Sequence, residues 1–151
     1  IWPTILAKLP NAKLKIVGFS PTTKIKKYGL EPSIKVLGAI KDIRDAFATS
    51  HMLLAPIRSG KGTRYKVLEA MITATPVVAT TLAAEGIDLH HGKDVLIADT
   101  SKDLADSSIK LLTSPTLQRK LGTAGQKIVQ RNYSWDTIAR QLDGVYQEFR
   151  N

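Results

Sequence analysis

The sequence predicts an α/β domain in which a mostly parallel sheet carries helices on both of its faces. Short apolar runs alternate along the chain with longer segments whose apolar residues recur at helical spacing. Glycine or proline stands at most of the junctions between them. Strands that alternate with helices pair in parallel, because each helix returns the chain to the end of the sheet from which the next strand starts. With 151 residues, 43% of them hydrophobic, the chain is long enough for one such domain.

The chain opens with a predicted amphipathic helix that ends near Pro10. Its apolar positions are Ile1, Ile5, Leu6 and Leu9. A sheet of this class normally begins with a strand rather than a helix. We therefore expect this chain to be a fragment that lacks the first strand of its sheet and the loop that follows it.

Two strands and two short helical segments come next. We predict a strand at 13–17, a loop with a helical turn at 19–28, a strand at 33–37 and a helix at 41–49. Gly18 and Gly38 end the two strands. The loop after Gly38 therefore lies at the carboxyl end of a strand, where open α/β sheets bind their ligands.

The centre of the chain contains a strand, loop, helix, strand unit. Its members are, in order, a strand at 52–55, a loop with Gly60 and Gly62, a helix with Arg64, Lys66 and Glu69, and a strand at 76–79. Such a unit builds parallel sheet and places the glycine loop at the carboxyl end of its first strand. This loop is therefore the leading candidate for a binding site.

The start of the central helix is unusually basic. Lys61, Arg64 and Lys66 cluster there, and no acidic residue precedes Glu69 within the unit. Because a helix amino terminus carries partial positive charge, each of these cations costs roughly 0.3–1 kcal/mol unless an anion binds beside it. One interpretation is that the glycine loop and the cations hold a phosphate. The other is that the cations are solvated surface charges.

Glu69 has two interpretations that are compatible with each other. On a helix it shares a face with Tyr65 and Lys66. A carboxylate one turn beyond a phosphate-binding loop is well placed to accept hydrogen bonds from sugar hydroxyls. It can also form an ion pair with Lys66, three residues back on the helix.

The last third of the chain is predicted to be mainly helical. We expect a strand at 94–98, helices at 101–112 and 115–129, and a last helix that continues to about residue 149. Ser101, Ser114 and Ser134 are the predicted amino-terminal residues of these helices. The apolar stripe of the last helix is predicted to pack in the core, and it consists of Trp135, Ile138, Leu142, Val145, Tyr146 and Phe149.

The composition excludes several kinds of site. The chain contains no cysteine, so it has neither disulfides nor a thiolate metal site. The histidines, His51, His90 and His91, have no further ligand at metal spacing, so we expect no bound metal. No apolar run approaches the roughly 20 residues that span a bilayer, and no signal peptide is visible. We therefore expect a cytoplasmic protein.

The positive charge is concentrated near the start of the chain. The net charge is +9, and no acidic residue precedes Glu31. The lysines before that residue are Lys8, Lys13, Lys15, Lys24, Lys26 and Lys27. Such a patch attracts anionic lipid headgroups or nucleic acid. Because no nucleic-acid motif or aromatic platform accompanies it, we expect no nucleic-acid partner.

Several stretches, taken in order, resemble one known family. They are Leu-Lys-Ile-Val-Gly at 14–18, Val-Leu-Gly at 36–38, Gly-Lys-Gly-Thr-Arg-Tyr-Lys-Val-Leu-Glu-Ala-Met at 60–71, Pro-Val-Val-Ala-Thr at 76–80, Glu-Gly-Ile at 85–87, Gly-Lys-Asp-Val-Leu-Ile-Ala at 92–98 and Tyr-Ser-Trp at 133–135. Together they resemble the carboxyl-terminal domain of the retaining glycosyltransferases of group 1 (family 4). The resemblance implies GT-B architecture, in which two Rossmann-like domains face each other across a cleft. Residues 1–151 would be the donor-binding domain of such an enzyme, without its amino-terminal acceptor domain.

The resemblance also implies roles for individual residues. Glu69 matches the second glutamate of the family's Glu-seven-residues-Glu motif, which binds the ribose of the donor. The first glutamate would fall at Lys61, so the chain departs from the family there, and this lysine would meet the diphosphate or an acidic sugar instead. A second departure at 73–75, where the family has a small residue followed by glycine, is expected to alter a turn. The implied donor-binding set is Ile40, whose backbone would meet the base, with Gly60, Lys61, Gly62, Thr63, Arg64, Lys66 and Glu69.

The implied activity is transfer of a hexose-like sugar from a nucleotide-diphosphate donor to a glycan or lipid-linked acceptor, with retention of anomeric configuration. Arg64 and Lys66 would stabilise the departing diphosphate, so neither a metal nor another cofactor would be required, and no general base is assigned. Without the acceptor domain, we expect the chain alone to be inactive. In GT-B enzymes the last helix often crosses back to the first domain, so the resemblance also implies that part of the apolar stripe of this helix is exposed here. Lipid-linked acceptors add an expectation of peripheral membrane contact. Two alternatives stay open, a nucleotide-sugar epimerase of the same architecture and a domain that binds nucleotide sugars without transferring them.

Overall fold

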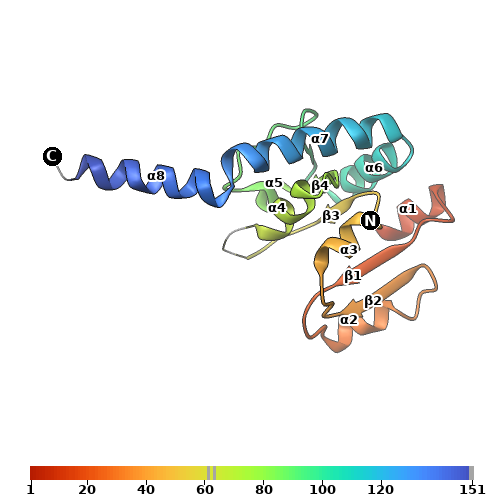
Figure 1. The fold of residues 1–151 in the computed structure, drawn as a ribbon. Helices are drawn as coiled ribbons and strands as arrows, with labels where there is room; N and C mark the ends of the chain where they lie inside the picture. The colour runs from red at the N-terminus through yellow and green to blue at the C-terminus, as the bar shows by residue number, and fades with distance from the viewer. Residues whose placement is uncertain (61, 63, 150–151) are drawn as a thin grey trace.

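The computed structural model describes residues 1–60, 62 and 64–149. Strands and helices alternate along the chain (Figure 1). The strands are β1 (Leu14–Val17), β2 (Ile34–Gly38), β3 (Leu53–Ala55), β4 (Val77–Ala79) and β5 (Leu96–Ile97). The helices are α1 (Trp2–Lys8), α2 (Thr23–Tyr28), α3 (Ile43–Ala48), α4 (Tyr65–Ile72), α5 (Thr81–Ala84), α6 (Ser101–Leu112), α7 (Pro115–Asn132) and α8 (Trp135–Glu148). Neighbouring strands pair in parallel, which confirms the predicted fold class.

The parallel strands form two sheets rather than one. β1 pairs with β2, with Leu14 opposite Ile34. In the larger sheet β4 lies between β3 and β5, with Val78 opposite both Leu54 and Leu96. A common strand order in doubly wound folds is 3-2-1-4-5-6. The observed orders, β2-β1 and β3-β4-β5, match that arrangement except for its first strand, whose place would lie between β1 and β3.

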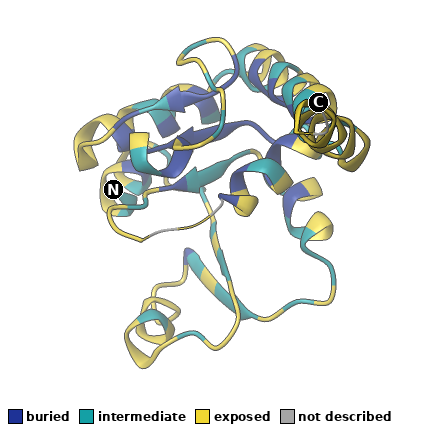
Figure 2. Ribbon diagram, turned by 90° about the vertical axis from the view of Figure 1, so that its left-hand side faces the viewer, coloured by how far each residue is buried: buried dark blue, intermediate teal, exposed yellow. Residues whose placement is uncertain are grey.

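The larger sheet carries a hydrophobic core on each of its faces. Because successive residues of a strand point to opposite sides, Val77 of β4 lies in one core and Val78 in the other. Met71 of α4 completes the first core, whereas Leu104 of α6 and Leu121 of α7 complete the second. Figure 2 shows the buried residues gathered in this sheet and in the helices around it. The sheet therefore lies between two helix layers, as predicted.

β1, α2 and β2 form a small lobe, residues 14–38, that buries little of its surface. Between residues 14 and 38, all of which are described, Ser33 alone is buried. Its hydroxyl accepts a hydrogen bond of 2.9 Å from Trp2 Nε1. Lys15 Nζ also donates to the carbonyl and hydroxyl oxygens of Thr49, at 3.2 and 2.8 Å. Polar contacts thus contribute much of the attachment between this lobe, seen at the bottom of Figure 2, and the rest of the chain.

Three helices differ from their predictions. α2 forms where a loop with a helical turn was expected, and Thr22 caps it. α6 is capped by Thr100 rather than Ser101, because the Thr100 hydroxyl accepts the backbone N–H of Asp103 at 3.0 Å. α5 was not predicted, since four residues are too few to show a helical period.

The last helix, α8, lies outside both cores. It projects from the end of α7 (Figure 1), and its apolar stripe faces solvent, with Trp135 84% exposed and Phe149 85% exposed. The prediction that this stripe packs in the core is therefore wrong for this structure, and the exposure that the resemblance implied for part of the stripe extends to all of it. The amphipathic pattern and the Ser134 cap are enough to form the helix. However, α8 has no extensive contact with any described element besides α7.

Candidate functional site

The candidate site lies at the carboxyl edge of the larger sheet. Because β3, β4 and β5 are parallel, the segments that follow them emerge on the same side. These segments are the glycine loop, which we define as residues 56–64, then α5, and then the turn that leads from β5 into α6. The position of the predicted loop at this edge agrees with the sequence analysis.

The two described glycines of the loop have backbone conformations that favour glycine. Gly60 has φ of 123° and Gly62 has φ of 98°. Among the described atoms, none lies within 4 Å of a Cβ built on either residue. Both glycines are thus required by the path of the backbone, not by close packing.

The amino terminus of α4 has neither an acid nor a side-chain cap. Arg64 occupies the cap position, but its side chain makes no capping hydrogen bond, and the first turn contains no acidic residue. The first N–H groups of a helix have no partner within the helix. Lys66, in the first turn, is exposed. This end of the helix thus combines a partial positive charge with a cationic side chain.

Arg64 itself faces inward. The residue is only 6% exposed. Its Nε donates to the carbonyl oxygen of Leu82 at 2.9 Å, and its Nη2 to that of Gly60 at 3.3 Å. The same Nη2 lies 3.5 Å from Glu85 Oε2. The structure thus joins the glycine loop to α5 through a residue that we predicted to bind phosphate directly, and that role stays a prediction.

Lys66 and Glu69 are both exposed on α4, on the side that also carries the exposed Tyr65. Within the described residues, Lys66 and Glu69 form no salt bridge with each other. The ion-pair interpretation of Glu69 therefore finds no support, and its carboxylate is accessible to a ligand. The assignment of Glu69 to a ribose stays a prediction.

The other predicted site residues are distributed as follows. Ile40 is half-buried in the segment that connects β2 to α3, at the carboxyl edge of the smaller sheet. Beside it, Arg44 donates to both carboxylate oxygens of Asp42 and holds the pKa of Asp42 below its usual value. Lys61 and Thr63 lie outside the described residues.

Two polar residues at the same edge were missed by the sequence analysis. Arg58 follows β3, and its Nη2 donates to Ser101 Oγ at 2.6 Å. Asp99 follows β5 and accepts the N–H and the hydroxyl of Thr81 at 2.8 and 2.7 Å. These hydrogen bonds lower the pKa of Asp99. Their only signal in the sequence is their position within three residues of the end of a predicted strand.

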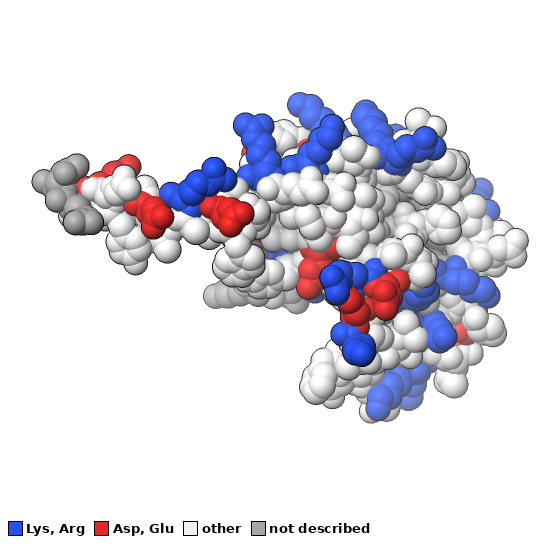
Figure 3. All heavy atoms as spheres, in the orientation of Figure 1, with Lys and Arg blue, Asp and Glu red and all other residues white. Residues whose placement is uncertain are grey.

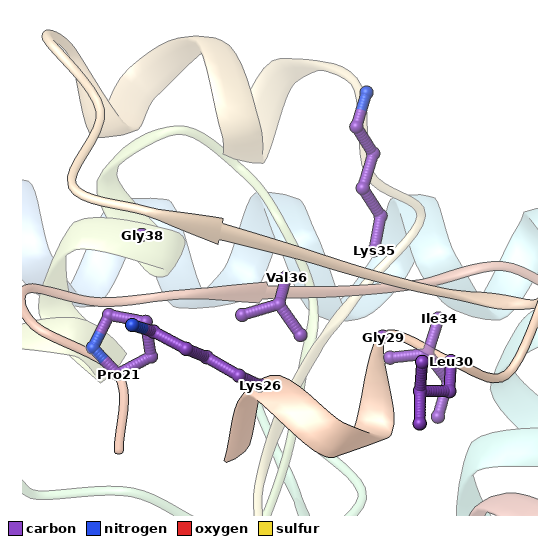
Figure 4. Close-up of a pocket in the computed structure, with 8 residues that line it drawn as sticks. All are labelled: Pro21, Lys26, Gly29, Leu30, Ile34, Lys35, Val36 and Gly38. Carbon is purple, nitrogen blue, oxygen red and sulfur yellow. The ribbon is translucent and has the colours of Figure 1, made fainter. Parts of the chain in front are cut away.

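A hollow outside this edge lies between α2 and β2. It has a volume of about 500 Å³, and Pro21, Lys26, Leu30 and Val36 are among its lining residues. In Figure 4, Lys26 extends between α2 and β2 toward Pro21, whereas Lys35 points away from α2. The hollow does not include any residue of the glycine loop or α4, so it does not belong to the predicted site.

Neither metal ligation nor membrane spanning has a structural signal in the described part of the chain. No group of three or more histidine, aspartate or glutamate side chains there is arranged to hold a metal ion. Of the helices that the structure describes, none combines the length and the apolar character that a membrane span requires.

The family model for group 1 glycosyl transferases matches residues 1–114. The chain belongs to this family. The match includes both sheets, the glycine loop and α4, so the candidate site lies entirely within the shared region. The resemblance seen in the sequence is thereby confirmed.

Two curated relatives of this glycosyltransferase chain are mannosyltransferases. The phosphatidyl-myo-inositol mannosyltransferase of Mycobacterium leprae is 30% identical over 151 residues, which cover 96% of this chain and 40% of the relative. The GDP-mannose-dependent monoacylated alpha-(1-6)-phosphatidylinositol monomannoside mannosyltransferase of Corynebacterium glutamicum is 28% identical, with coverage of 96% and 41%. The chain thus spans about 40% of the length of these relatives.

Solved glycosyltransferase structures share the fold of the chain. Sucrose-phosphate synthase from Thermosynechococcus elongatus superimposes with a TM-score of 0.80 at 21% identity, over 96% of this chain and 40% of that protein. HepE from Anabaena, solved in complex with UDP, gives a TM-score of 0.79 at 18% identity, over 97% and 44%. The GT-B glycosyltransferases thus contain a domain of this architecture.

Proposed function

We propose that this chain binds the nucleotide-diphosphate sugar of a retaining glycosyltransferase at the glycine loop and α4. The observation that carries the proposal is the amino terminus of α4, which has no side-chain cap and no acidic residue, while Lys66 stands exposed in its first turn. A diphosphate at this position would accept hydrogen bonds from the N–H groups of the helix terminus and offset its positive charge. Gly60 and Gly62 carry no side chain that would keep such a ligand away from the loop backbone.

The names of the relatives support a nucleotide donor. The Corynebacterium glutamicum enzyme is named as GDP-mannose-dependent, and HepE was solved with UDP. Both named mannosyltransferases act on phosphatidylinositol compounds, which supports a lipid-linked acceptor for the whole protein.

The proposed chemistry depends on stabilisation of the leaving group. Negative charge builds on the diphosphate as the bond to the sugar breaks. The Lys66 ammonium group, the loop N–H groups and the helix dipole offset this charge without a metal or another cofactor. Glu69, one turn further along α4, accepts hydrogen bonds from the donor ribose.

We also propose that the chain is the donor half of a larger GT-B enzyme. The acceptor domain precedes residue 1, and the strand nearest to this chain inserts between β1 and β3. The N–H groups of Leu14 and Gly18 point to β2, so those of Lys15 and Val17 face the opposite edge. Amide exchange of the whole protein tests this, since an inserted strand protects the N–H groups of Lys15 and Val17, and rapid exchange there would refute it.

Peripheral membrane contact is a further part of the proposal. The small lobe carries Lys24, Lys26 and Lys27 on α2. Phe19, before this helix, is 90% exposed, and Leu30, after it, is 84% exposed. Figure 3 shows lysine and arginine side chains on the surface of this lobe. Cations beside exposed apolar side chains suit an anionic bilayer. Binding of the whole protein to phosphatidylglycerol vesicles, lost at high salt, is the expected result, and failure to bind at low salt would remove this part.

The test of the donor site is calorimetric titration of the whole protein that contains this chain. UDP, GDP and ADP, and their sugars, are compared on wild type, Glu69→Gln and Lys66→Gln. Binding of one base series, weakened about tenfold or more by each substitution, is expected. Absence of binding to every nucleotide would contradict the proposal. Product analysis then separates sugar transfer from epimerisation and from binding without turnover.

A further inference from the structure

We propose that Arg64 is a positioning residue, which holds the glycine loop against α5 and thereby sets how the loop receives the donor. This inference rests on the proposed function for its consequence, but its structural part does not depend on a donor. It departs from the expectation that Arg64 touches the diphosphate itself.

The first argument is the direction of the guanidinium group. Arg64 is 6% exposed, and its side chain donates hydrogen bonds to the carbonyl oxygens of Leu82 and Gly60. A buried cation without good partners is costly, so these contacts are required for the side chain to remain there. Leu82 lies 18 residues along the chain from Arg64, in α5. The hydrogen bonds therefore connect two segments that meet only at the carboxyl edge of the sheet.

The second argument is the effect on Gly60. A carbonyl oxygen that faced an incoming diphosphate would repel it. Because Arg64 Nη2 takes up the Gly60 carbonyl at 3.3 Å, this oxygen is turned toward the protein. If Arg64 were replaced, the Gly60 peptide group would be free to rotate, since Gly60 has no side chain to restrict it.

The third argument is that Arg64 is one of several side chains whose hydrogen bonds hold the same loop to the neighbouring helices. The Thr80 hydroxyl donates to the Ile57 carbonyl at 2.6 Å, and Arg58 donates to Ser101 Oγ at 2.6 Å. These contacts hold the first half of the loop to the start of α5 and to α6. Arg64 supplies the corresponding contact for Gly60, in the second half.

Glu85 has a secondary part in this arrangement. Its carboxylate lies 3.5 Å from Arg64 Nη2, and its side chain is 69% exposed. At that distance and exposure it neutralises the guanidinium only in part. We therefore expect Glu85 to orient Arg64, and its loss to matter less than the loss of Arg64.

Arginine is suited to this role in a way that lysine is not. A guanidinium presents donors in a fixed planar fork, so Nε and Nη2 can reach two carbonyl oxygens at once. A lysine would keep the positive charge but lose this geometry. Arg64→Lys therefore separates a positioning role from a role of charge alone.

The test compares Arg64→Lys, Arg64→Gln and Glu85→Gln in the whole protein, with Arg119→Gln on the exposed face of α7 as the control for loss of one cation. Backbone NMR order parameters of Gly60 and Gly62, measured without donor, are the first readout. We expect them to fall below about 0.6, the range of a flexible backbone, in both Arg64 variants, to fall less in Glu85→Gln, and not to change in the control. Unchanged order parameters in the Arg64 variants would overturn the proposal. If those variants do not fold, a Glu85→Gln variant with the order parameters of wild type overturns it instead.

Donor binding is the second readout. Arg64→Lys and Arg64→Gln are both expected to raise the Kd for the donor about tenfold, because both lose the paired hydrogen bonds of the guanidinium to Leu82 and Gly60. A lysine variant that binds like wild type would show that charge alone matters, and would overturn the positioning role. A wild type that binds no nucleotide would contradict the proposed function instead, while the order parameters of Gly60 and Gly62 still decide the role of Arg64.

Discussion

Gly122 of α7 lies directly against the backbone carbonyl of Ala74, in the turn between α4 and β4. A Cβ at position 122 would collide with that carbonyl oxygen, and its carbonyl carbon would be only 3.1 Å away. Backbone cannot move aside as easily as a flexible side chain. We predict that Gly122→Ala lowers the free energy of unfolding by about 2 kcal/mol, since overpacking typically costs 1–3 kcal/mol. Urea denaturation measures this change.

The same substitution at Gly144 of α8 provides the matched control. No described atom lies within 4 Å of a Cβ built there. Gly144→Ala should therefore show only the gain in helix propensity, roughly 0.5–1 kcal/mol. Equal effects at the two glycines would contradict the close packing of α7 on the turn.

Ala74 itself has a backbone conformation that favours glycine. Its φ is 57°, in the left-handed region, and it occupies the turn at 73–75 where the sequence departs from the family pattern. Left-handed backbone costs an ordinary residue roughly 1–2 kcal/mol, which exceeds the entropic cost of glycine in the unfolded chain. We predict that Ala74→Gly raises the free energy of unfolding by about 0.5–1 kcal/mol. Ala48→Gly, at the end of α3, should lower it, and a loss at both sites would refute the argument.

Local signals in the sequence account for most of the fold. Ser114 and Ser134 cap α7 and α8 as predicted, because a cap depends on residues three positions apart. The exposure of Trp135 did not follow from the amphipathic pattern, which shows that a face is apolar but does not identify what covers it. Only the family resemblance indicated that part of this face is exposed.

At the candidate site, too, the sequence predicts the position of a segment but not the direction of its side chains. The position of the glycine loop follows from the order of strands and helices, which the sequence displays. The inward direction of Arg64 depends mainly on the carbonyl oxygen of Leu82, 18 residues away along the chain. A basic cluster indicates an anion site, but it does not reveal which cation reaches the anion and which one supports the loop.

Burial of Asp94 should make the free energy of unfolding decrease as the pH rises. The residue is buried, and burial raises the pKa of its carboxyl above the ordinary 3.8, although the N–H of His90 donates to it at 2.8 Å. The folded chain then binds a proton more tightly than the unfolded chain, so stability falls as the pH rises from 3.8 through the raised pKa. Asp94→Asn keeps the hydrogen-bond acceptor and removes the charge. We expect its stability relative to wild type to increase over that interval in urea titrations, and a constant difference would exclude this assignment.

Asp99 should show the opposite dependence. The hydroxyl and N–H of Thr81 both donate to it and lower its pKa below the ordinary 3.8. The stabilisation is complete above that value and is lost as the pH falls through the lowered pKa. Wild type should therefore lose stability relative to Asp99→Asn only in this acidic range. A loss on the alkaline side would show that the carboxylate is not stabilised by Thr81.

Thr80 connects the stability of the fold to the shape of the loop. It is 2% exposed, its hydroxyl donates to Ile57 at 2.6 Å, and the same oxygen accepts the N–H of Ala83 at 3.1 Å. Thr80→Val has nearly the same shape but leaves both partners unpaired, so we predict a loss of about 2–3 kcal/mol in urea denaturation. The control is Thr113→Val, whose exposed hydroxyl bonds to Ile109 of the preceding helical turn, and which should change stability by less than about 0.5 kcal/mol. Similar losses at both threonines would mean that the Ile57 contact does not hold the loop. A larger loss at Thr80, accompanied by weaker donor binding, would show that the loop must be braced from α5 before it can receive a ligand.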